Sequence, residues 1–167
     1  MRLDLRPILR TPGASLPFQF QLDLSGMDFY GARPFAHPVR VSGAVRNMAG
    51  ALSLEGTAET TLELVCDRCL KPFSQDLALP VSTLLAEELE DEENDEIVLL
   101  QDGAADLDEI FTTALVLSMD AKHLCSEDCK GLCPTCGADL NLGPCQCRKE
   151  PDPRFAALAQ LLDKENE

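Results

Sequence analysis

Residues 125–147 read CSEDCKGLCPTCGADLNLGPCQC and hold six of the eight cysteines of the chain. Within Cys133-Pro-Thr-Cys136-Gly137, Pro134 presets φ for a tight turn, and Gly137 can adopt the positive φ that often follows such a turn. This pattern is typical of a zinc knuckle. Cys145 and Cys147 are two positions apart, so an extended segment places both on one side. Two close pairs of thiolates are what a closed structural Zn²⁺ site requires, at Zn–S distances of about 2.3 Å.

The other two cysteines, Cys66 and Cys69, form a CDRC motif far upstream. Two four-thiolate zinc sites would use all eight cysteines, and one or two structural ions are expected. The favoured partition places Cys133, Cys136, Cys145 and Cys147 in one site, and Cys66, Cys69, Cys125 and Cys129 in the other. An alternative pairs Cys66 and Cys69 with Cys133 and Cys136. Spacing in the sequence does not decide between the two.

Other uses of these thiols stay open at this point. Thiolates also suit an iron–sulfur cluster, and small buried cysteines need no metal at all. A Cys-x-x-Cys pair can cycle through a disulfide, and this interpretation is strongest for Cys66 and Cys69. His37 and His123 are isolated in the sequence, which favours surface or capping roles. No phosphate loop, dinucleotide fingerprint or nucleophile elbow occurs, and no pair of carboxylates has acid–base spacing.

The chain has 167 residues, 45% of them hydrophobic, which is enough for one core with a small metal-held appendage. The first ten residues, MRLDLRPILR, contain no apolar stretch typical of a secretory signal. No apolar run approaches the roughly 20 residues of a transmembrane helix. We therefore expect a cytoplasmic protein whose cysteines are reduced, and neither a membrane nor a small molecule is expected as a partner.

The net charge of −15 is concentrated in one part of the chain. Residues 1–86 are neutral, residues 87–128 carry fifteen acids and one Lys, and residues 129–167 carry six acids and five bases. Non-specific affinity for RNA comes mainly from a generally basic surface that neutralises phosphates. A chain this acidic cannot bind RNA in that way. The acids of residues 87–96, EELEDEENDE, predict a mobile solvated loop or an arm that binds something basic, such as a ribosomal protein.

Alternating apolar residues predict an α+β fold built on an antiparallel β-sheet with one buried face. The alternation covers residues 18–24, 39–46, 51–66 and 73–85, and CDRC falls at the turn between the last two runs. Residues 97–100 predict a short buried strand that returns to the sheet. Asp106 opens a helix with Glu109 completing a capping box, and the apolar stripe is Leu107, Ile110, Phe111, Ala114, Leu115 and Ser118.

A second packed helix is predicted from Asp152-Pro153, with an apolar face of Phe155, Leu158, Ala159 and Leu162. The expected organisation is a sheet-and-helix core over residues 1–124 and a cysteine-rich, zinc-ribbon-like element with the last helix over residues 125–167. Both parts belong to one compact unit.

Several motifs together resemble the YceD family, described as the large ribosomal RNA subunit accumulation protein. They are CDRCLKPF after an amphipathic strand, the acidic run, the Asp-Leu-Asp-Glu-Ile helix, and CSEDCKGLCPTCGADLN…CQC followed by DPRFAAL. The resemblance runs from about Leu3 to Leu162. It implies a bacterial cytoplasmic protein needed for synthesis, processing or stability of large-subunit ribosomal RNA, with relatives in plastids. Because some family members lack much of the C-terminal cysteine cluster, it favours Cys66 and Cys69 as the functional pair.

Combined with the charge, this resemblance predicts a non-enzymatic ribosome-biogenesis factor. It would bind a ribosomal protein or the pre-ribosomal large subunit through the acidic loop, and could touch ribosomal RNA through a local basic face of Arg33, Arg40, Arg46, Arg68 and Lys71. The rival hypothesis is a thiol-based redox regulator that uses the CDRC pair. A zinc hydrolase is third, since it would need an open coordination position that four-cysteine sites lack.

Overall fold

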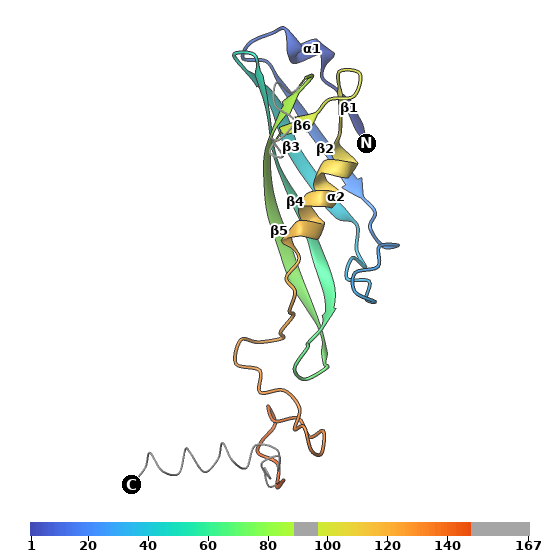
Figure 1. Ribbon diagram of the computed structural model, residues 1–167, viewed down its shortest axis with the longest axis vertical. Helices are drawn as coiled ribbons and strands as arrows, with labels where there is room; N and C mark the ends of the chain where they lie inside the picture. The colour runs from blue at the N-terminus through green and yellow to red at the C-terminus, as the bar shows by residue number, and fades with distance from the viewer. Residues whose placement is uncertain (89–96, 148–167) are drawn as a thin grey trace, which may run out of the picture.

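The computed structural model describes residues 1–88 and 97–147, and its main element is a twisted five-stranded sheet (Figure 1). The strand order is β2-β3-β4-β5-β6. The bounds of the strands are β2 Ser15–Leu22, β3 Val39–Met48, β4 Ala51–Val65, β5 Pro72–Ala86 and β6 Ile97–Leu99. Neighbouring strands from β2 to β5 pair antiparallel, as their alternating pattern predicted.

The strand predicted at residues 97–100 exists, but two of its expected features differ. β6 pairs parallel with β5, with Leu84 opposite Ile97. It is also only partly buried: Ile97 and Val98 are half-buried, Leu99 is exposed and only Leu100, just beyond the strand, is buried. The reason is its place at the edge of the sheet, where it pairs on one side only.

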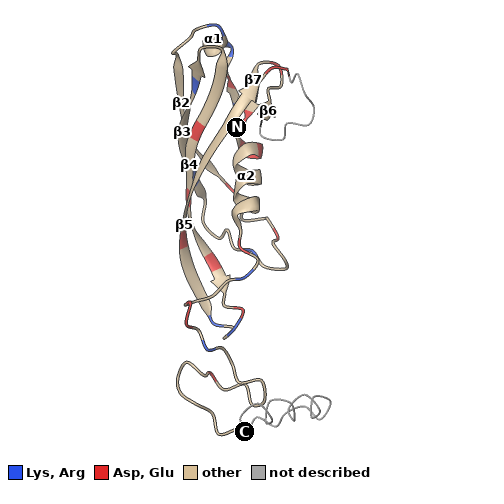
Figure 2. Ribbon diagram, turned by 60° about the vertical axis from the view of Figure 1, so that its left-hand side comes forward, with Lys and Arg blue, Asp and Glu red and all other residues tan. Residues whose placement is uncertain are grey.

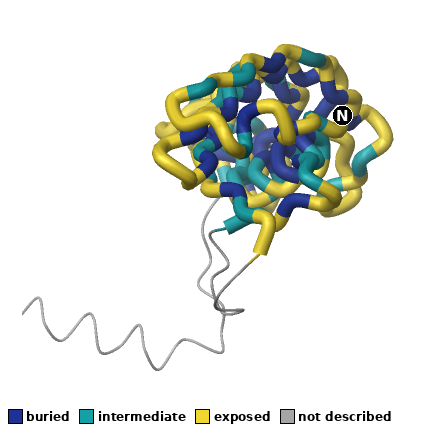
Figure 3. Tube along the Cα trace, turned by 90° about the horizontal axis from the view of Figure 1, so that it is seen from above, coloured by how far each residue is buried: buried dark blue, intermediate teal, exposed yellow. Residues whose placement is uncertain are grey.

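One face of the sheet packs against helix α2, Leu107–Ser118. The Asp106 carboxylate caps this helix by accepting hydrogen bonds from the backbone N–H groups of Asp108 and Glu109. Phe111 of α2 is fully buried and meets the ring of Phe18 on β2 edge to face, with ring centroids 5.9 Å apart. A tube coloured by burial shows this core as the interior of the sheet-and-helix body (Figure 3).

Two opposed glycines make room for these rings. Gly43 on β3 lies opposite Gly56 on β4. A Cβ atom on Gly56 would lie 2.9 Å from the Phe111 ring, and one on Gly43 would lie 2.8 Å from the Phe18 ring. The two glycines therefore allow the aromatic pair to lie directly on the sheet.

Three short N-terminal and connecting elements were not predicted. Strand β1, Arg2–Asp4, pairs antiparallel with β7, Ala104–Asp106, as a separate two-stranded sheet. Helix α1, Arg6–Leu9, follows β1, and the buried side chain of Asn47 donates hydrogen bonds to the carbonyls of Ile8 and Leu9 at its end. Elements of three or four residues are too short to show a period.

The hairpin of β4 and β5 determines where the cysteines lie. Both strands have 15 residues, whereas β3 pairs with β4 only as far as Arg40 opposite Glu59. The far end of the hairpin therefore projects beyond the core, and the segment that follows α2 runs down to meet it (Figure 1).

The α+β fold class is confirmed, with the cysteine-rich element at the far end of the hairpin. Residues 89–96 of the acidic run and the helix predicted from Asp152 lie outside the described residues. No helix in the described ranges is long and apolar enough to cross a membrane.

Candidate metal centres

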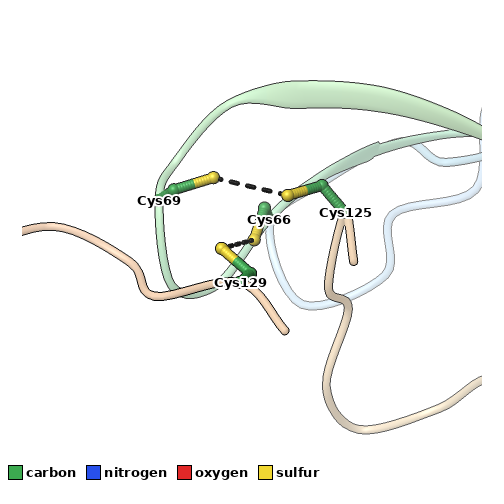
Figure 4. A group of neighbouring side chains, drawn as sticks. All are labelled: Cys66, Cys69, Cys125 and Cys129. Atoms are coloured by element: carbon green, nitrogen blue, oxygen red, sulfur yellow. Dashed lines mark hydrogen bonds between the residues drawn. The ribbon is translucent and has the colours of Figure 1, made fainter. Parts of the chain in front are cut away.

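The first group of thiols joins the hairpin to the chain that follows α2. Cys66 and Cys69 lie in the turn between β4 and β5, and Cys125 and Cys129 come from the later segment (Figure 4). The Sγ atoms of Cys66 and Cys129 are 3.8 Å apart, and those of Cys69 and Cys125 are 3.6 Å apart. Cys66, Cys69 and Cys129 are buried, while Cys125 is exposed.

The second group lies entirely within the cysteine-rich segment. It consists of Cys133, Cys136, Cys145 and Cys147, and the Sγ atoms of Cys133 and Cys145 are 3.4 Å apart. Only Cys133 is buried, so this group is more open to solvent than the first. The structure thus brings the thiols together in the partition that the sequence favoured, and the alternative pairing of Cys66 and Cys69 with Cys133 and Cys136 does not form.

The spacing of the sulfur atoms fits a tetrahedral metal site. Within each group all four lie within 4.8 Å of one another. Four sulfurs at about 2.3 Å from a central Zn²⁺ would be about 3.8 Å apart, close to the 3.4–3.8 Å between the sulfurs of the three pairs given above. A disulfide would require about 2.05 Å, so all eight cysteines are free thiols.

The first cysteine of each Cys-x-x-Cys is set up as a thiolate by the backbone. The pKa of Cys66 is lowered to about 6, chiefly by the N–H of Cys125 and also by those of Cys69 and Arg68. The pKa of Cys133 is likewise lowered to about 6, by the N–H groups of Cys136 and Thr135. A hydrogen bond to the charged form of a group favours that form. Both knuckles therefore present a sulfur ready to ligate a cation.

Without a cation, the four thiols of a group cannot all ionise. The neighbouring Cys69 and Cys66 sulfurs raise the pKa of Cys125 to about 12. The Cys136 sulfur does the same for Cys147, again to about 12. Like charges this close exclude one another unless a positive ion lies between them. The donor set therefore suits a thiophilic cation, which all four sulfurs could ligate and whose charge would offset the repulsion between the thiolates.

Polar contacts hold the cysteine-rich segment against the hairpin turn. Arg68 donates a hydrogen bond to the Cys129 carbonyl at 2.7 Å, and its own carbonyl accepts one from the N–H of Leu132. Asp67 and His123 exchange two hydrogen bonds, one of 2.6 Å from the His123 N–H to the Asp67 carboxylate. Neither His123 nor His37 belongs to a four-ligand group in the described ranges.

Three of the five residues of the expected basic face have partners within the chain. Lys71 forms an ion pair with Asp139 at 2.5 Å, and Arg68 is used within the hairpin turn. Arg40 lies on the exposed face of β3, 3.8 Å from Glu59. Of the five bases, Arg40 and Arg46 lie on β3, Arg33 lies in the loop before it, and Arg68 and Lys71 lie in the turn between β4 and β5 (Figure 2). The two hairpin bases therefore bind a carbonyl and a carboxylate of the cysteine-rich segment.

Two residues near the thiols were missed from the sequence. Asp139 pairs with Lys71, and the side chain of Asn141 donates to the Cys129 sulfur at 3.5 Å. Asp and Asn are common in loops as local turn formers. The Ala-Asp-Leu-Asn run therefore gives no signal that Asp139 and Asn141 contact Lys71 and the Cys129 sulfur.

The fold and the thiols define an α+β protein whose C-terminal segment is organised around two sets of four cysteines at the end of a β-hairpin. This chain belongs to the YceD family: the family model described as large ribosomal RNA subunit accumulation protein YceD matches residues 54–162. The match begins in β4 and includes CDRC, α2 and all eight cysteines.

Similar proteins come from bacteria and from plants. An uncharacterised protein of Mycobacterium tuberculosis is 28% identical, over 100% of this chain and 84% of its own length. The large ribosomal RNA subunit accumulation protein YCED homolog 1, chloroplastic, of Zea mays is 33% identical over 76% of this chain, which covers 55% of the maize protein. The uncharacterised protein YlbN of Bacillus subtilis is 28% identical, over 78% of this chain and 77% of its own length. No solved structure matches this chain.

Proposed function

We propose that this chain is a ribosome-biogenesis factor that supports the synthesis, processing or stability of large-subunit ribosomal RNA. The observation that carries the proposal is the family match over residues 54–162. The maize and Arabidopsis thaliana relatives, both named as large ribosomal RNA subunit accumulation proteins, support it. Within this role, the chain acts as a binding or adaptor protein and not as an enzyme.

Structural zinc is part of the proposal. Four thiolates around Zn²⁺ make a closed site without a coordination position for a substrate or a reactive water. Such an ion at the first group would cross-link the hairpin turn to the chain after α2, since Cys69 and Cys125 are 56 residues apart in sequence. Apparent binding free energies of roughly 10 kcal/mol for structural zinc would then contribute to folding. Metal analysis of the purified protein tests this; less than half an equivalent per chain would reject it.

The charge of the chain favours a basic protein as the direct partner. Of the ten residues 87–96, eight are acidic. A pocket of about 230 Å³ lies between the β2–β3 loop and the hairpin. Its lining includes Glu63, Asp67, Asp120 and the exposed Tyr30, and no Lys or Arg of the described residues. Carboxylates and an aromatic ring suit a Lys or Arg side chain. Ribosomal proteins are the basic partners at hand on a pre-ribosomal large subunit.

The test separates the charge of residues 87–96 from the order of their side chains. The eight acids of residues 87–96 are replaced by Gln and Asn in one variant, with a second variant in which the residues are shuffled and every acid is kept. We expect the neutral variant to lose co-sedimentation with precursor large subunits and the shuffled one to retain it. Unchanged association of the neutral variant would exclude the acidic run as the binding element.

The redox regulator is the second candidate, and one observation favours it. The pKa of Cys66 is lowered to about 6 by backbone N–H groups, first that of Cys125, which is the condition for a reactive thiolate. Against it, Cys66 is 0% and Cys69 4% exposed, which leaves little access for a partner disulfide. Mass spectrometry after the metal-loaded protein is treated with a mild oxidant decides: a reversible Cys66–Cys69 disulfide, formed with release of the ion, supports the regulator.

A further inference from the structure

The two groups of thiols are connected by one side chain. Asn141 lies in the loop between Cys136 and Cys145, so the second group encloses it in sequence. Its Nδ2 atom nevertheless donates to the sulfur of Cys129, a member of the first group, at 3.5 Å. Its Oδ1 atom accepts a hydrogen bond of 2.8 Å from the N–H of Lys130, the residue after Cys129. Asn141 thus contacts both the ligand and the backbone that carries it.

Asp139 holds Asn141 in place. One carboxylate oxygen accepts hydrogen bonds from the backbone N–H of Asn141 at 2.9 Å and from its Nδ2 at 2.8 Å. The other oxygen pairs with Lys71 of the hairpin at 2.5 Å. Because the Asp139 side chain is only 11% exposed, this arrangement is more restrained than a pair on an open surface.

We propose that the two thiol groups bind metal cooperatively, with Asn141 as the positioning residue that couples them. This rests on the proposed structural metal sites. An ion at the second group would hold Cys136 and Cys145 together and so close the loop that carries Asn141. The closed loop keeps the N–H donor against the Cys129 sulfur, where it stabilises the thiolate that the first group needs. An open loop releases that donor.

The expected change in metal affinity follows from the hydrogen bond that Asn141 donates to the Cys129 sulfur. Loss of an outer-shell hydrogen bond to a metal ligand typically lowers metal affinity by 10- to 100-fold. Asn141 is exposed, so the lower end applies, and about tenfold is expected. Linkage requires that an occupied first group tightens the second by the same factor.

The test uses Cd²⁺ alone, a thiophilic tetrahedral probe whose NMR resonance distinguishes the two sites. Affinity at the first group is measured by chelator competition in four forms of the full chain. They are the natural chain, Asn141→Ala, the double variant Cys136→Ser with Cys147→Ser, and the combination of all three substitutions. We expect Asn141→Ala and the double Cys→Ser variant each to weaken metal affinity at the first group about tenfold. The combination of all three substitutions should weaken that affinity no more than either change alone.

A matched control and a spectral readout separate coupling from local damage. Leu142→Ala changes the neighbouring residue, which is 83% exposed, and should leave the affinity of both groups unchanged. Asn141→Asp keeps the acceptor for Lys130 but removes the N–H donor, so it should shift the Cd²⁺ resonance of the first group and weaken it at least as much as Asn141→Ala. Additive losses in the triple variant, or an unchanged affinity in Asn141→Ala, would overturn the coupling. No Cd²⁺ or Zn²⁺ binding at either group would instead reject the metal sites themselves.

Discussion

Removal of the proposed metal cross-link at the first group should destabilise the sheet, and removal of the one proposed at the second group should not. The perturbation is the double substitution Cys125→Ser with Cys129→Ser, which takes both downstream ligands from the first group. The matched control is Cys136→Ser with Cys147→Ser, which takes two ligands from the second. Both proteins are prepared with zinc in excess, so that the group left intact stays loaded despite any coupling.

The size of the effect follows from the loop that the first group closes. Cys69 and Cys125 are 56 positions apart, and the enclosed chain contains β5, β6, β7 and α2. Loss of a cross-link that closes a loop of this length raises the entropy of the unfolded chain, which lowers the free energy of unfolding by about 4 kcal/mol. For a chain of this size each kcal/mol shifts the melting midpoint by roughly 2–4 °C, so a fall of about 10 °C is expected. The second group closes a short loop outside the sheet core, since Cys133 and Cys145 are 12 positions apart.

Far-UV circular dichroism is the appropriate assay, because the chain has no Trp and a single Tyr. Chelator added to the natural chain should reproduce the lower midpoint of the first double variant and should leave that variant unchanged. Equal midpoints for the two double variants, or a natural chain that melts identically with and without chelator, would refute the role of the first group as a cross-link.

Three further outcomes can be measured on the same material. Phe111→Ala should lower the free energy of unfolding by about 3–5 kcal/mol, because loss of the fully buried ring leaves a cavity. Urea unfolding measures this change, and a loss below about 1 kcal/mol, the scale of a surface substitution, would contradict it. Asp106→Ala should cost about 1 kcal/mol through loss of the α2 cap, whereas Asp106→Asn should retain most of it. Zinc binding at about pH 7.5 should release fewer than four protons per ion, because the Cys66 pKa of about 6 leaves that thiol ionised while Cys125, at about 12, must lose its proton. Affinity should therefore rise with pH, and more steeply below about 6, where Cys66 must lose its proton as well. Calorimetry in buffers of different ionisation enthalpy measures the proton count.

The elements predicted correctly are those that local rules determine. Strands β4 and β5 are 15 residues each and were expected from period-two alternation; one face of β4 is buried, and β5 has Val81 and Leu85 buried with its other inward apolar residues half-buried. The α2 start follows from Asp106 as an N-cap. The position of CDRC at the β4–β5 turn follows from the two strands on either side of it.

The partition of the thiols could be favoured but not decided from the sequence, because it depends on long-range geometry. Cys66 meets Cys129 from 63 positions away, and only the length of the hairpin and the path after α2 bring them together. The parallel pairing of β6 depends in the same way on where the chain re-enters the sheet. The contact from Asn141 to a sulfur of the other group has no local signature at all.

The arrangement of charge explains how an acidic chain could act on ribosomal RNA through a protein. RNA affinity that does not depend on sequence rises with the number of phosphates that Lys and Arg neutralise. Here two hairpin bases are used internally: Arg68 on the Cys129 carbonyl and Lys71 on Asp139. Arg40 faces Glu59 across the strands. Three of the five bases that the sequence offered for a phosphate surface therefore hold the cysteine-rich segment or face an acid. The acids of residues 87–128 outnumber the bases there by fourteen. Under the proposed function, a basic protein partner would complement this excess of acids, and contact with RNA would follow from what that partner binds.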